Sequence, residues 1–123
     1  MKLYNSEKRE NESISGACVQ AKIIRKEDKK IYLRIWNSGT EPAYNVNFYI
    51  PKGHRICVLR SRNNCRILEP GRAFDEYAVA DEKLSKGILV VTYWEDEYGC
   101  VYSMEQPEAA KNILKKNLYV MND

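Results

Sequence analysis

The sequence contains few of the residues on which catalytic and metal centres depend. His54 is the only histidine in 123 residues, so a nucleophilic Ser or Cys has a single imidazole to serve as its base. The six glycines are isolated from one another, and none opens a strand-to-helix unit of the kind that binds nucleotide phosphates. These absences exclude the common phosphate cradles and favour a protein without catalytic residues and without a cofactor.

Long apolar runs are absent as well. No stretch approaches the roughly 18 apolar residues that span a membrane, and residues 1–11 are charged where a signal peptide has an apolar centre. The chain as given is therefore expected to be cytoplasmic and not to insert into a membrane. If it is a fragment of a longer protein, an exported or membrane-associated location is the alternative.

Cys-x-x-Cys pairs are also missing, although the chain has four cysteines, Cys18, Cys57, Cys65 and Cys100. Their wide spacing, together with one histidine, matches zinc sites poorly, so no metal site is predicted. We expect reduced and mostly buried thiols, with two disulfides as the alternative in an oxidising compartment. The acidic run 95–97 is interpreted as a charged hairpin tip, because it lacks the Asp-x-Asp pattern of calcium loops.

Composition and length indicate one globular domain. Hydrophobic residues make up 44% and charged residues 30% of the chain, and 123 residues enclose a single core. The 20 Lys and Arg residues exceed the 17 Asp and Glu residues only slightly, so the net charge alone does not indicate a polyanion partner. Residues 1–16 are predicted to form a flexible tail and residues 17–106 the folded domain. Residues 107–123 are predicted to form a helical appendage, because Pro107 precedes apolar residues at helical spacing.

The domain is predicted to consist of short antiparallel strands. Runs rich in Ile, Val and Tyr alternate with turn-forming clusters at the spacing of β-sandwiches and barrels. Strands are expected at 19–25, 30–37, 43–50, 56–59, 72–80, 88–94 and 100–106, with an irregular stretch at 54–68. Strand 88–94 is dense in β-branched and aromatic residues, which places it at the centre of a sheet. In strand 43–50, a period of two puts Tyr44, Val46, Phe48 and Ile50 on one face.

Three segments resemble bacterial immunoglobulin-like modules of the CARDB type. The stretch from Leu33 to Phe48 contains an Asn-Ser-Gly turn before a strand that opens with Ala-Tyr-Asn-Val, similar to the second and third strands of those modules. The stretches from Leu68 to Phe74 and from Val91 to Gly99 resemble the approach to a middle strand and the last hairpin. The resemblance implies an all-β, immunoglobulin-like antiparallel β-sandwich of about seven strands. It also implies a non-catalytic role, because such modules space, stabilise or present binding surfaces within larger bacterial proteins.

The outward-facing residues of strands 30–37 and 43–50 are the first candidate for a binding surface. Aromatic residues and arginine are enriched at protein interfaces, where they often supply the anchoring energy. The predicted contact face consists of Tyr32, Arg34, Trp36, Asn45, Asn47 and Tyr49, on the condition that the two strands are neighbours. Its partner is expected to be another protein or the remainder of a larger chain, and the oligomeric state is left open.

The basic segment 52–72 is the alternative surface, suited to an anion or a nucleic acid. It contains Lys52, Arg55, Arg60, Arg62, Arg66 and Arg72, opposed only by Glu69. Arginine forks suit phosphate and carboxylate groups, and binding of a polyanion depends on salt. Charged side chains on irregular edge strands also prevent aggregation between sheets, and we favour that explanation. The sequence therefore predicts a non-catalytic protein-interaction or structural module, with nucleic-acid binding as the less favoured alternative.

Overall fold

Eight β-strands make up most of the part of the chain that the computed structural model describes, which comprises residues 16–51, 55–60, 65–81, 87–109 and 113. The strands are β1 (Val19–Arg25), β2 (Ile31–Asn37), β3 (Ala43–Tyr49), β4 (Ile56–Leu59), β5 (Cys65–Leu68), β6 (Ala73–Ala80), β7 (Ile88–Glu95) and β8 (Val101–Glu108). All except β5 coincide with expected strands to within about two residues at each end, the usual uncertainty of strand boundaries. β5 lies in the stretch that the sequence indicated as irregular.

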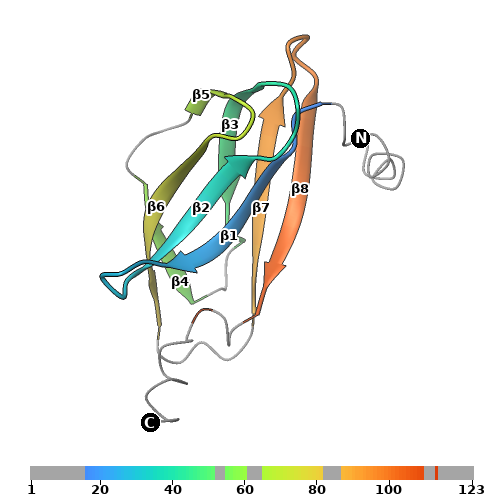
Figure 1. The fold of residues 1–123 in the computed structure, drawn as a ribbon. Coiled ribbons are helices and arrows are strands. Elements are labelled where there is room, and N and C mark those ends of the chain that lie inside the picture. Colours follow the sequence, from blue (N-terminus) through green and yellow to red (C-terminus); the bar gives the residue numbers. More distant parts are fainter. Residues whose placement is uncertain (1–15, 52–54, 61–64, 82–86, 110–112, 114–123) are drawn as a thin grey trace.

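The strands form two four-stranded antiparallel sheets that pack face to face (Figure 1). The first sheet has the order β1-β2-β6-β4, and the second has the order β5-β3-β7-β8. The first order matches strands A, B, E and D of an immunoglobulin domain, and β3, β7 and β8 match strands C, F and G. The predicted all-β, immunoglobulin-like sandwich is therefore confirmed. The sandwich differs from an immunoglobulin domain in the order of two edge strands along the chain. Here β4, at the edge of the first sheet, precedes β5, at the edge of the second.

The core is built from the inward-facing residues of both sheets. In β2, Leu33 and Ile35 are fully buried, and the residues next to them along the strand are half-buried. This alternation is the one that a period of two predicted. From the second sheet, Val46 and Val90 are equally inaccessible to solvent. β7 lies between β3 and β8, which confirms its predicted place inside a sheet. Removing such apolar surface from water contributes about 25 cal/mol per Å², so this layer holds the sheets together.

Polar side chains close one side of the sandwich by joining the two sheets. Thr92 Oγ1 on β7 donates to Val19 O on β1 over 2.7 Å. Gln106 Oε1 on β8 accepts from Ala21 N, and Gln106 Nε2 donates to Thr92 Oγ1 over 3.2 Å. Because these partly buried groups bond one another, polar contacts help to hold β1 against β7 and β8.

A β-bulge at Asn45 interrupts β3. The φ of Asn45 is 49°, and the pairing of β3 with β7 changes register between Tyr44 and Asn47. Tyr44 is paired with Ile67, which is 51% exposed, so Tyr44 belongs to the outer surface. The expectation that Tyr44 shares a face with Val46 is therefore wrong. Periodicity assumes an uninterrupted strand, and the extra residue of the bulge breaks that assumption.

The predicted C-terminal helix is wrong at its start. Pro107 and Glu108 are the last residues of β8, where Pro107 is paired with Leu89. β8 is an edge strand, and proline is tolerated there because its nitrogen need not donate to a neighbouring strand. Of the remaining appendage only Ala109 and Ile113 are described, and Ile113 is buried in the core. The predicted tail 1–16 lies outside the described residues apart from Gly16. Within the described ranges, no helix has both the length and the apolar character that crossing a membrane requires.

Candidate interaction surfaces

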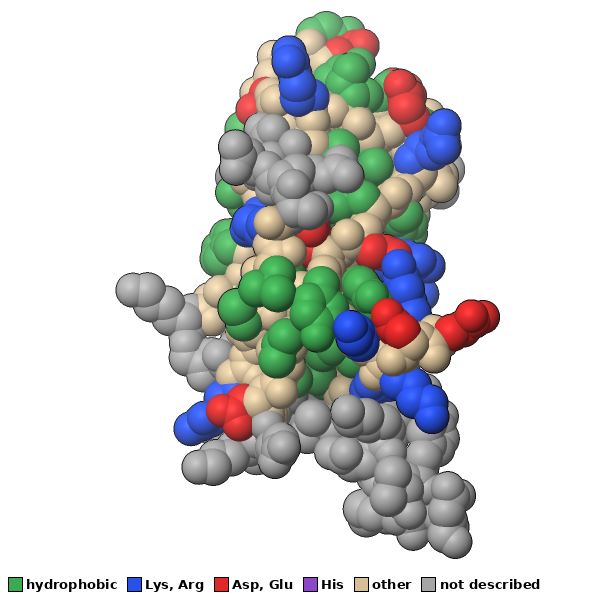
Figure 2. Space-filling model, turned by 90° about the vertical axis from the view of Figure 1, so that its left-hand side faces the viewer, with side chains coloured by type: hydrophobic (Ala, Val, Ile, Leu, Met, Phe, Trp, Pro, Cys, Tyr) green, Lys and Arg blue, Asp and Glu red, His purple; other side chains and the backbone are tan. Residues whose placement is uncertain are grey.

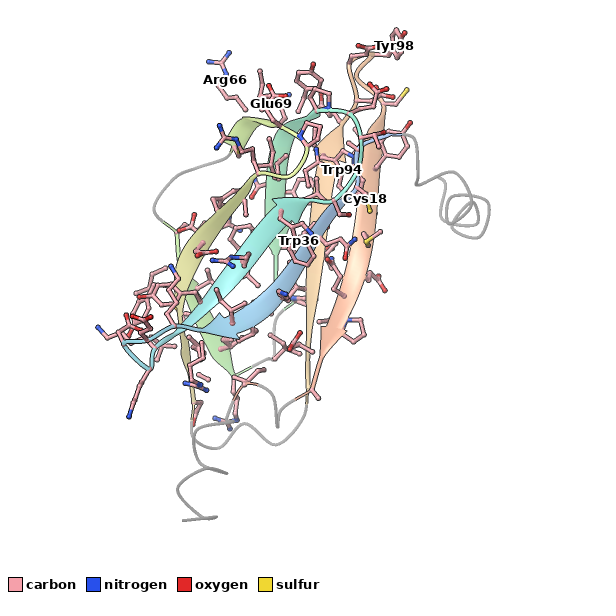
Figure 3. The ribbon with its side chains drawn as sticks, in the orientation of Figure 1. Cys18, Trp36, Arg66, Glu69, Trp94 and Tyr98 are labelled. Carbon is pink, nitrogen blue, oxygen red and sulfur yellow. The ribbon has the colours of Figure 1, made fainter. Side chains whose placement is uncertain are left out.

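The structure divides the six residues of the predicted contact face between two sheets. Three of them, Tyr32, Arg34 and Trp36, lie on β2, whose neighbours are β1 and β6. Figure 3 shows Trp36 on this sheet. The other three lie on β3, which pairs with β5 and β7. The condition that the two strands are neighbours is not met, because the chain crosses from one sheet to the other between them.

Strand register builds a larger surface around the three residues of β2. Tyr32 is paired with Ile24 of β1 and with Tyr77 of β6, and Tyr77 is in turn paired with Leu59 of β4. Paired residues project from the same side of a sheet, so these four side chains form one row across the first sheet. The rings of Tyr32 and Tyr77 lie 5.7 Å apart, and Leu59 is 50% exposed. We call the outer surface formed by Tyr32, Arg34, Trp36, Leu59 and Tyr77 the aromatic face.

Three lysines cover the rings of the aromatic face. The ammonium group of Lys22 lies 5.3 Å from the ring centre of Trp36. That of Lys26 lies 4.2 Å from the ring centre of Tyr32, and that of Lys30 lies 5.5 Å from the ring centre of Tyr77. At exposed sites such contacts contribute about 0.5–1 kcal/mol each. The lysines therefore shield apolar rings from water and give the aromatic face a positive outer layer.

A carboxylate on the neighbouring strand holds Arg34 in place. The Nε and Nη2 atoms of Arg34 donate to Asp75 Oδ1 at 2.7 Å and to Asp75 Oδ2 at 2.9 Å. Lys26 adds an ion pair to Asp75 Oδ2 at 2.9 Å. The hydrogen bond from Arg34 is the main reason that the pKa of Asp75 is lowered, and it outweighs partial burial, which acts in the opposite direction. Because both ends of the guanidinium fork are bonded, the centre of the aromatic face is ordered.

The turn between β1 and β2 fixes Tyr32. The hydroxyl of Tyr32 donates to Asp28 Oδ2 over 2.8 Å, and Lys30 N donates to Asp28 Oδ1 over 2.9 Å. The backbone hydrogen bond from Lys30, followed by the bond from Tyr32, lowers the pKa of Asp28. The bond to Asp28 raises the pKa of Tyr32, so Tyr32 remains a neutral donor at pH 7.

The β3 residues of the predicted contact face form a separate surface on the second sheet. Asn45 Nδ2 donates to Glu95 Oε1 at 3.3 Å, and Asn47 Oδ1 accepts from Arg60 Nη1 at 2.8 Å. Tyr49 is 49% exposed. Asn45 and Asn47 are thus engaged in local polar contacts, the ring centre of Tyr49 lies 6.1 Å from that of Tyr93, and all three residues lie on the other sheet from the aromatic face.

The basic segment is divided as well. Two of its six basic residues, Lys52 and Arg62, lie outside the described residues. Arg55 and Arg60 flank β4 in the first sheet, whereas Arg66 lies on β5 in the second. Figure 3 shows Arg66 near β5 at one end of the sandwich. Arg72 is exposed and immediately precedes β6. The four described arginines therefore do not share one strand edge.

The two arginines beside β4 both have partners. Arg55 Nη1 lies 2.8 Å from Asp81 Oδ2 in an exposed ion pair. Arg60 donates to Asn47 Oδ1 at 2.8 Å and to Phe48 O, and its guanidinium lies 3.9 Å from the centre of the Phe48 ring. The charge of Arg55 is thus matched by a carboxylate, whereas the two described hydrogen-bond acceptors of Arg60 are neutral.

A hollow of about 320 Å³ opens beside β4. Phe48 and Ile50 from the end of β3 line it, together with Ile56 and Val58 from β4 and with Arg60. β4 is an edge strand, and β6 is its one described neighbour. Figure 2 views the molecule from the side where β6 and β4 lie in Figure 1, and it shows hydrophobic side chains gathered there with charged side chains around them. This side of the molecule therefore combines apolar surface with a strand edge along which no further described strand lies.

The described residues bring no metal-binding cluster together. No cluster of three or more His, Cys, Asp or Glu side chains suited to a metal ion occurs among them. The single histidine, His54, lies outside the described residues. All four cysteines are free, and the expectation of buried thiols holds for Cys18 and Cys65 while Cys57 and Cys100 are exposed.

The acidic run 95–97 lies where β7 turns into β8. Asp96 Oδ1 accepts from Tyr98 N at 2.8 Å and from Cys100 N at 2.9 Å, and Asp96 Oδ2 accepts from the Tyr102 hydroxyl at 3.1 Å. Desolvation acts to raise the pKa of Asp96, but the hydrogen bonds from Cys100, Tyr98 and Tyr102 together lower it. Both oxygens of Asp96 are thus used to shape the turn.

Sequence reasoning missed the contributions of β6 and β4 to the aromatic face. In β6, the half-buried Tyr77 alternates with Glu76 and Ala78, which are buried, so the direction of Tyr77 follows from a period of two. Its position beside Tyr32 does not follow, because that depends on which strand β6 joins. Leu59 was within an expected strand, but its exposure became apparent only from the pairing of β4 with β6.

No family model and no curated protein matches the sequence. Among solved structures, the crystal structure of the GAE domain of GGA2p from Saccharomyces cerevisiae is similar to this chain, with 13% sequence identity and a TM-score of 0.43. The similarity covers 75% of this chain and 88% of that chain. At this identity and score it does not bear on function, which has to be inferred from the surfaces described above.

Proposed function

We propose that the protein is a non-catalytic interaction module that binds a partner protein through the aromatic face. The supporting observation is the row across the first sheet, in which Tyr32, Tyr77 and Leu59 follow one another on the outer surface. Tyr, Trp and Arg supply much of the binding energy at protein interfaces, and these side chains point away from the sandwich core. The proposal keeps Tyr32, Arg34 and Trp36 from the predicted contact face and leaves out the three residues of β3.

The order within the aromatic face favours binding. Arg34 is held by Asp75, and Tyr32 is held by Asp28. Immobilising a free side chain at an interface costs about 0.5–1.5 kcal/mol, and side chains that are already ordered avoid most of that cost. The motif resemblance to bacterial CARDB-type modules supports the same role, with another protein or another part of a longer chain as the partner.

A double substitution, Trp36→Ala with Tyr77→Ala, tests the proposal. Proteins retained by the immobilised wild-type chain are identified, purified and titrated individually against each variant by calorimetry. We expect at least about tenfold weaker binding for the double variant, because anchoring aromatic residues contribute about 2 kcal/mol or more. Tyr98→Ala is the matched control, since Tyr98 is 81% exposed at the turn between β7 and β8. Unchanged affinity of a folded double variant would contradict the proposal.

Binding of a polyanion through the basic segment 52–72 is the less supported alternative. Among its described residues, Arg55 is paired with Asp81, and Arg66 belongs to the other sheet from Arg60. Titration with single-stranded and double-stranded nucleic acid at two salt concentrations separates the two functions. Affinity that falls steeply with salt and depends on Arg60 and Arg66 would support the alternative.

A further inference from the structure

The outer edge of β4 presents backbone groups that can be assigned from the register of β4 with β6. Asp81 N donates to Arg55 O over 3.0 Å, so these two residues form a hydrogen-bonded pair. Such pairs alternate along antiparallel strands, so Cys57 also bonds toward β6, whereas Ile56 and Val58 direct their N–H and C=O groups away from it. No described strand lies along that outer edge. At the outer edge of the first sheet, Ile56 and Val58 therefore have backbone groups that are oriented to pair with a further strand.

The same edge borders the apolar hollow. Ile56 and Val58 line the hollow, together with Phe48 of β3 and Ile50, which immediately follows β3. On this side, β3 has no described partner strand beyond Val46, the last of its residues paired with β5. A strand placed along β4 directs every second side chain toward the hollow, because side chains alternate along a strand.

A basic side chain lies at each end of β4. Of the described arginines, Arg55 immediately precedes β4 and Arg60 immediately follows it. At one end of β4, Arg60 donates to the neutral acceptors Asn47 Oδ1 and Phe48 O, so neither of these partners compensates its charge. At the other end, Arg55 is paired with Asp81. A strand that carries carboxylates matches this edge better than a neutral or basic strand.

We infer that β4 is a docking edge for an extended, acidic segment of a partner protein, which pairs with Ile56 and Val58 as an added strand. Main-chain hydrogen bonds supply affinity, apolar side chains of the segment enter the hollow, and its carboxylates face Arg60. This assignment presupposes the proposed interaction role and adds the conformation and the charge of the partner. A second copy of this chain and a nucleic acid are the competing occupants.

A model peptide tests the assignment directly. The probe is a fluorescein-labelled peptide of about nine residues, the length of a strand, in which valine and glutamate alternate. Its binding to the intact protein is followed by fluorescence anisotropy. One control peptide has lysine in place of glutamate, and a second has N-methyl groups on its central amides. We expect both controls to bind at least about tenfold more weakly, because the first reverses the charge and the second removes main-chain donors.

Two pairs of protein variants locate the binding edge. Val58→Pro removes an N–H that points away from β6, and an edge strand accepts proline at such a position. Val58→Ala is its control, because it also removes the packing of the valine side chain but keeps the N–H. Arg60→Gln removes the charge beside the hollow, and Arg66→Gln removes one from β5. Val58→Pro is expected to bind the acidic peptide at least about tenfold more weakly than Val58→Ala. Arg60→Gln is expected to weaken binding and reduce its salt dependence, whereas Arg66→Gln leaves both unchanged.

Amide hydrogen exchange keeps the test decisive if Val58→Pro does not fold. In the wild-type protein, exchange at Ile56 and Val58 should slow when the peptide is added. Absence of peptide binding at about 1 mM, equal binding of the N-methylated peptide, or unchanged exchange at both amides overturns the inference. Self-association of the protein that Val58→Pro abolishes would also overturn the inference. The same holds if single-stranded nucleic acid displaces the labelled peptide at a lower concentration than the unlabelled peptide does. If the peptide fails while Trp36→Ala with Tyr77→Ala still releases the partner, the proposed function stands without this docking edge.

Discussion

Asn37 Nδ2 donates a hydrogen bond to Leu68 O over 2.9 Å, and this bond joins β2 of the first sheet to β5 of the second. The same nitrogen donates to Glu41 O at 2.8 Å. Asn37 Oδ1 accepts from Cys18 N at 3.1 Å and from Gly39 N at 2.9 Å. Asn37 is fully buried, the bonds to Leu68 O and Cys18 N are buried, and the bonds to Glu41 O and Gly39 N are partly buried. One asparagine thus connects two sheets and the turn between β2 and β3.

Asn37→Leu should destabilise the fold strongly. The substitution leaves Leu68 O, Glu41 O and Cys18 N without the amide group that they bond, and each buried group left unpaired costs roughly 1–3 kcal/mol. We expect the free energy of unfolding to fall by about 2–4 kcal/mol, measured by urea denaturation with tryptophan fluorescence. Ser103→Ala, at an exposed position of β8, should change it by less than about 0.5 kcal/mol. Similar values for both variants would show that the Asn37 bonds do not stabilise the protein.

Gly39→Ala should be more damaging than Gly71→Ala. A Cβ atom at position 39 would lie 1.9 Å from Gly16 O and 2.7 Å from Cys18 N, so the backbone has to move. At position 71 the φ of 80° disfavours alanine, but the space around a Cβ atom is open. We expect losses of about 2 kcal/mol or more for Gly39→Ala and about 1 kcal/mol for Gly71→Ala. Thermal midpoints measured side by side check the order, and the reverse order would refute the close approach at Gly39.

Asp75→Asn should reduce the acid sensitivity of the protein. Arg34 lowers the pKa of Asp75 in the folded state from its ordinary value of 3.8. A carboxyl group with a lowered folded pKa stabilises the folded state above its unfolded pKa, and this contribution is lost as the pH falls through the folded value. The wild type should therefore lose stability below about pH 4, and Asp75→Asn should lose less over the same interval.

Urea midpoints at pH 7 and at about pH 3 measure the effect of Asp75. Arg34→Met is the complementary variant, since it keeps the carboxyl group and removes its first partner. Both variants should be less stable than the wild type at pH 7 and should show a smaller difference between the two pH values. If the urea midpoints of both variants differed between the two pH values as much as those of the wild type, the pair of Arg34 and Asp75 would contribute nothing to the pH dependence of stability.

The four cysteines should separate into two classes by reactivity. Cys57 and Cys100 are exposed, whereas Cys18 and Cys65 are buried. A colorimetric thiol reagent should therefore modify two thiols of the folded protein rapidly and all four after unfolding in denaturant. Peptide mapping should find the fast labels at Cys57 and Cys100, and rapid labelling of Cys18 in the folded protein would contradict its burial.

Most of the fold was predictable because strand alternation is a local property. β2 alternates buried and half-buried residues along its whole length, and its sequence reports this directly. β5 was missed because Arg66 and Ile67, which are consecutive, are both exposed between two buried residues. A strand of four residues with that pattern has no period of two to detect. The bulge at Asn45 escaped notice for a related reason, since it depends on how β3 meets β7.

The candidate surface could be predicted only within one strand. The direction of Tyr32, Arg34 and Trp36 follows from the alternation of β2. Their neighbours do not follow, because the chain determines only after folding that β6, and not β3, lies beside β2. The aromatic face therefore includes Tyr77, which was not predicted, and does not include Tyr49, which was.

The pairing of β2 with β6 also bears on how the protein is synthesised. Arg34 and its partner Asp75 are separated by 41 residues, so the hairpin of β1 and β2 leaves the ribosome well before the strand that completes its sheet. During that interval the apolar inner side of the hairpin and one strand edge face water, and pairings between residues so distant in sequence form slowly. The nascent chain is therefore most vulnerable to mispairing after the hairpin of β1 and β2 has emerged from the ribosome and before residues 73–80 follow it.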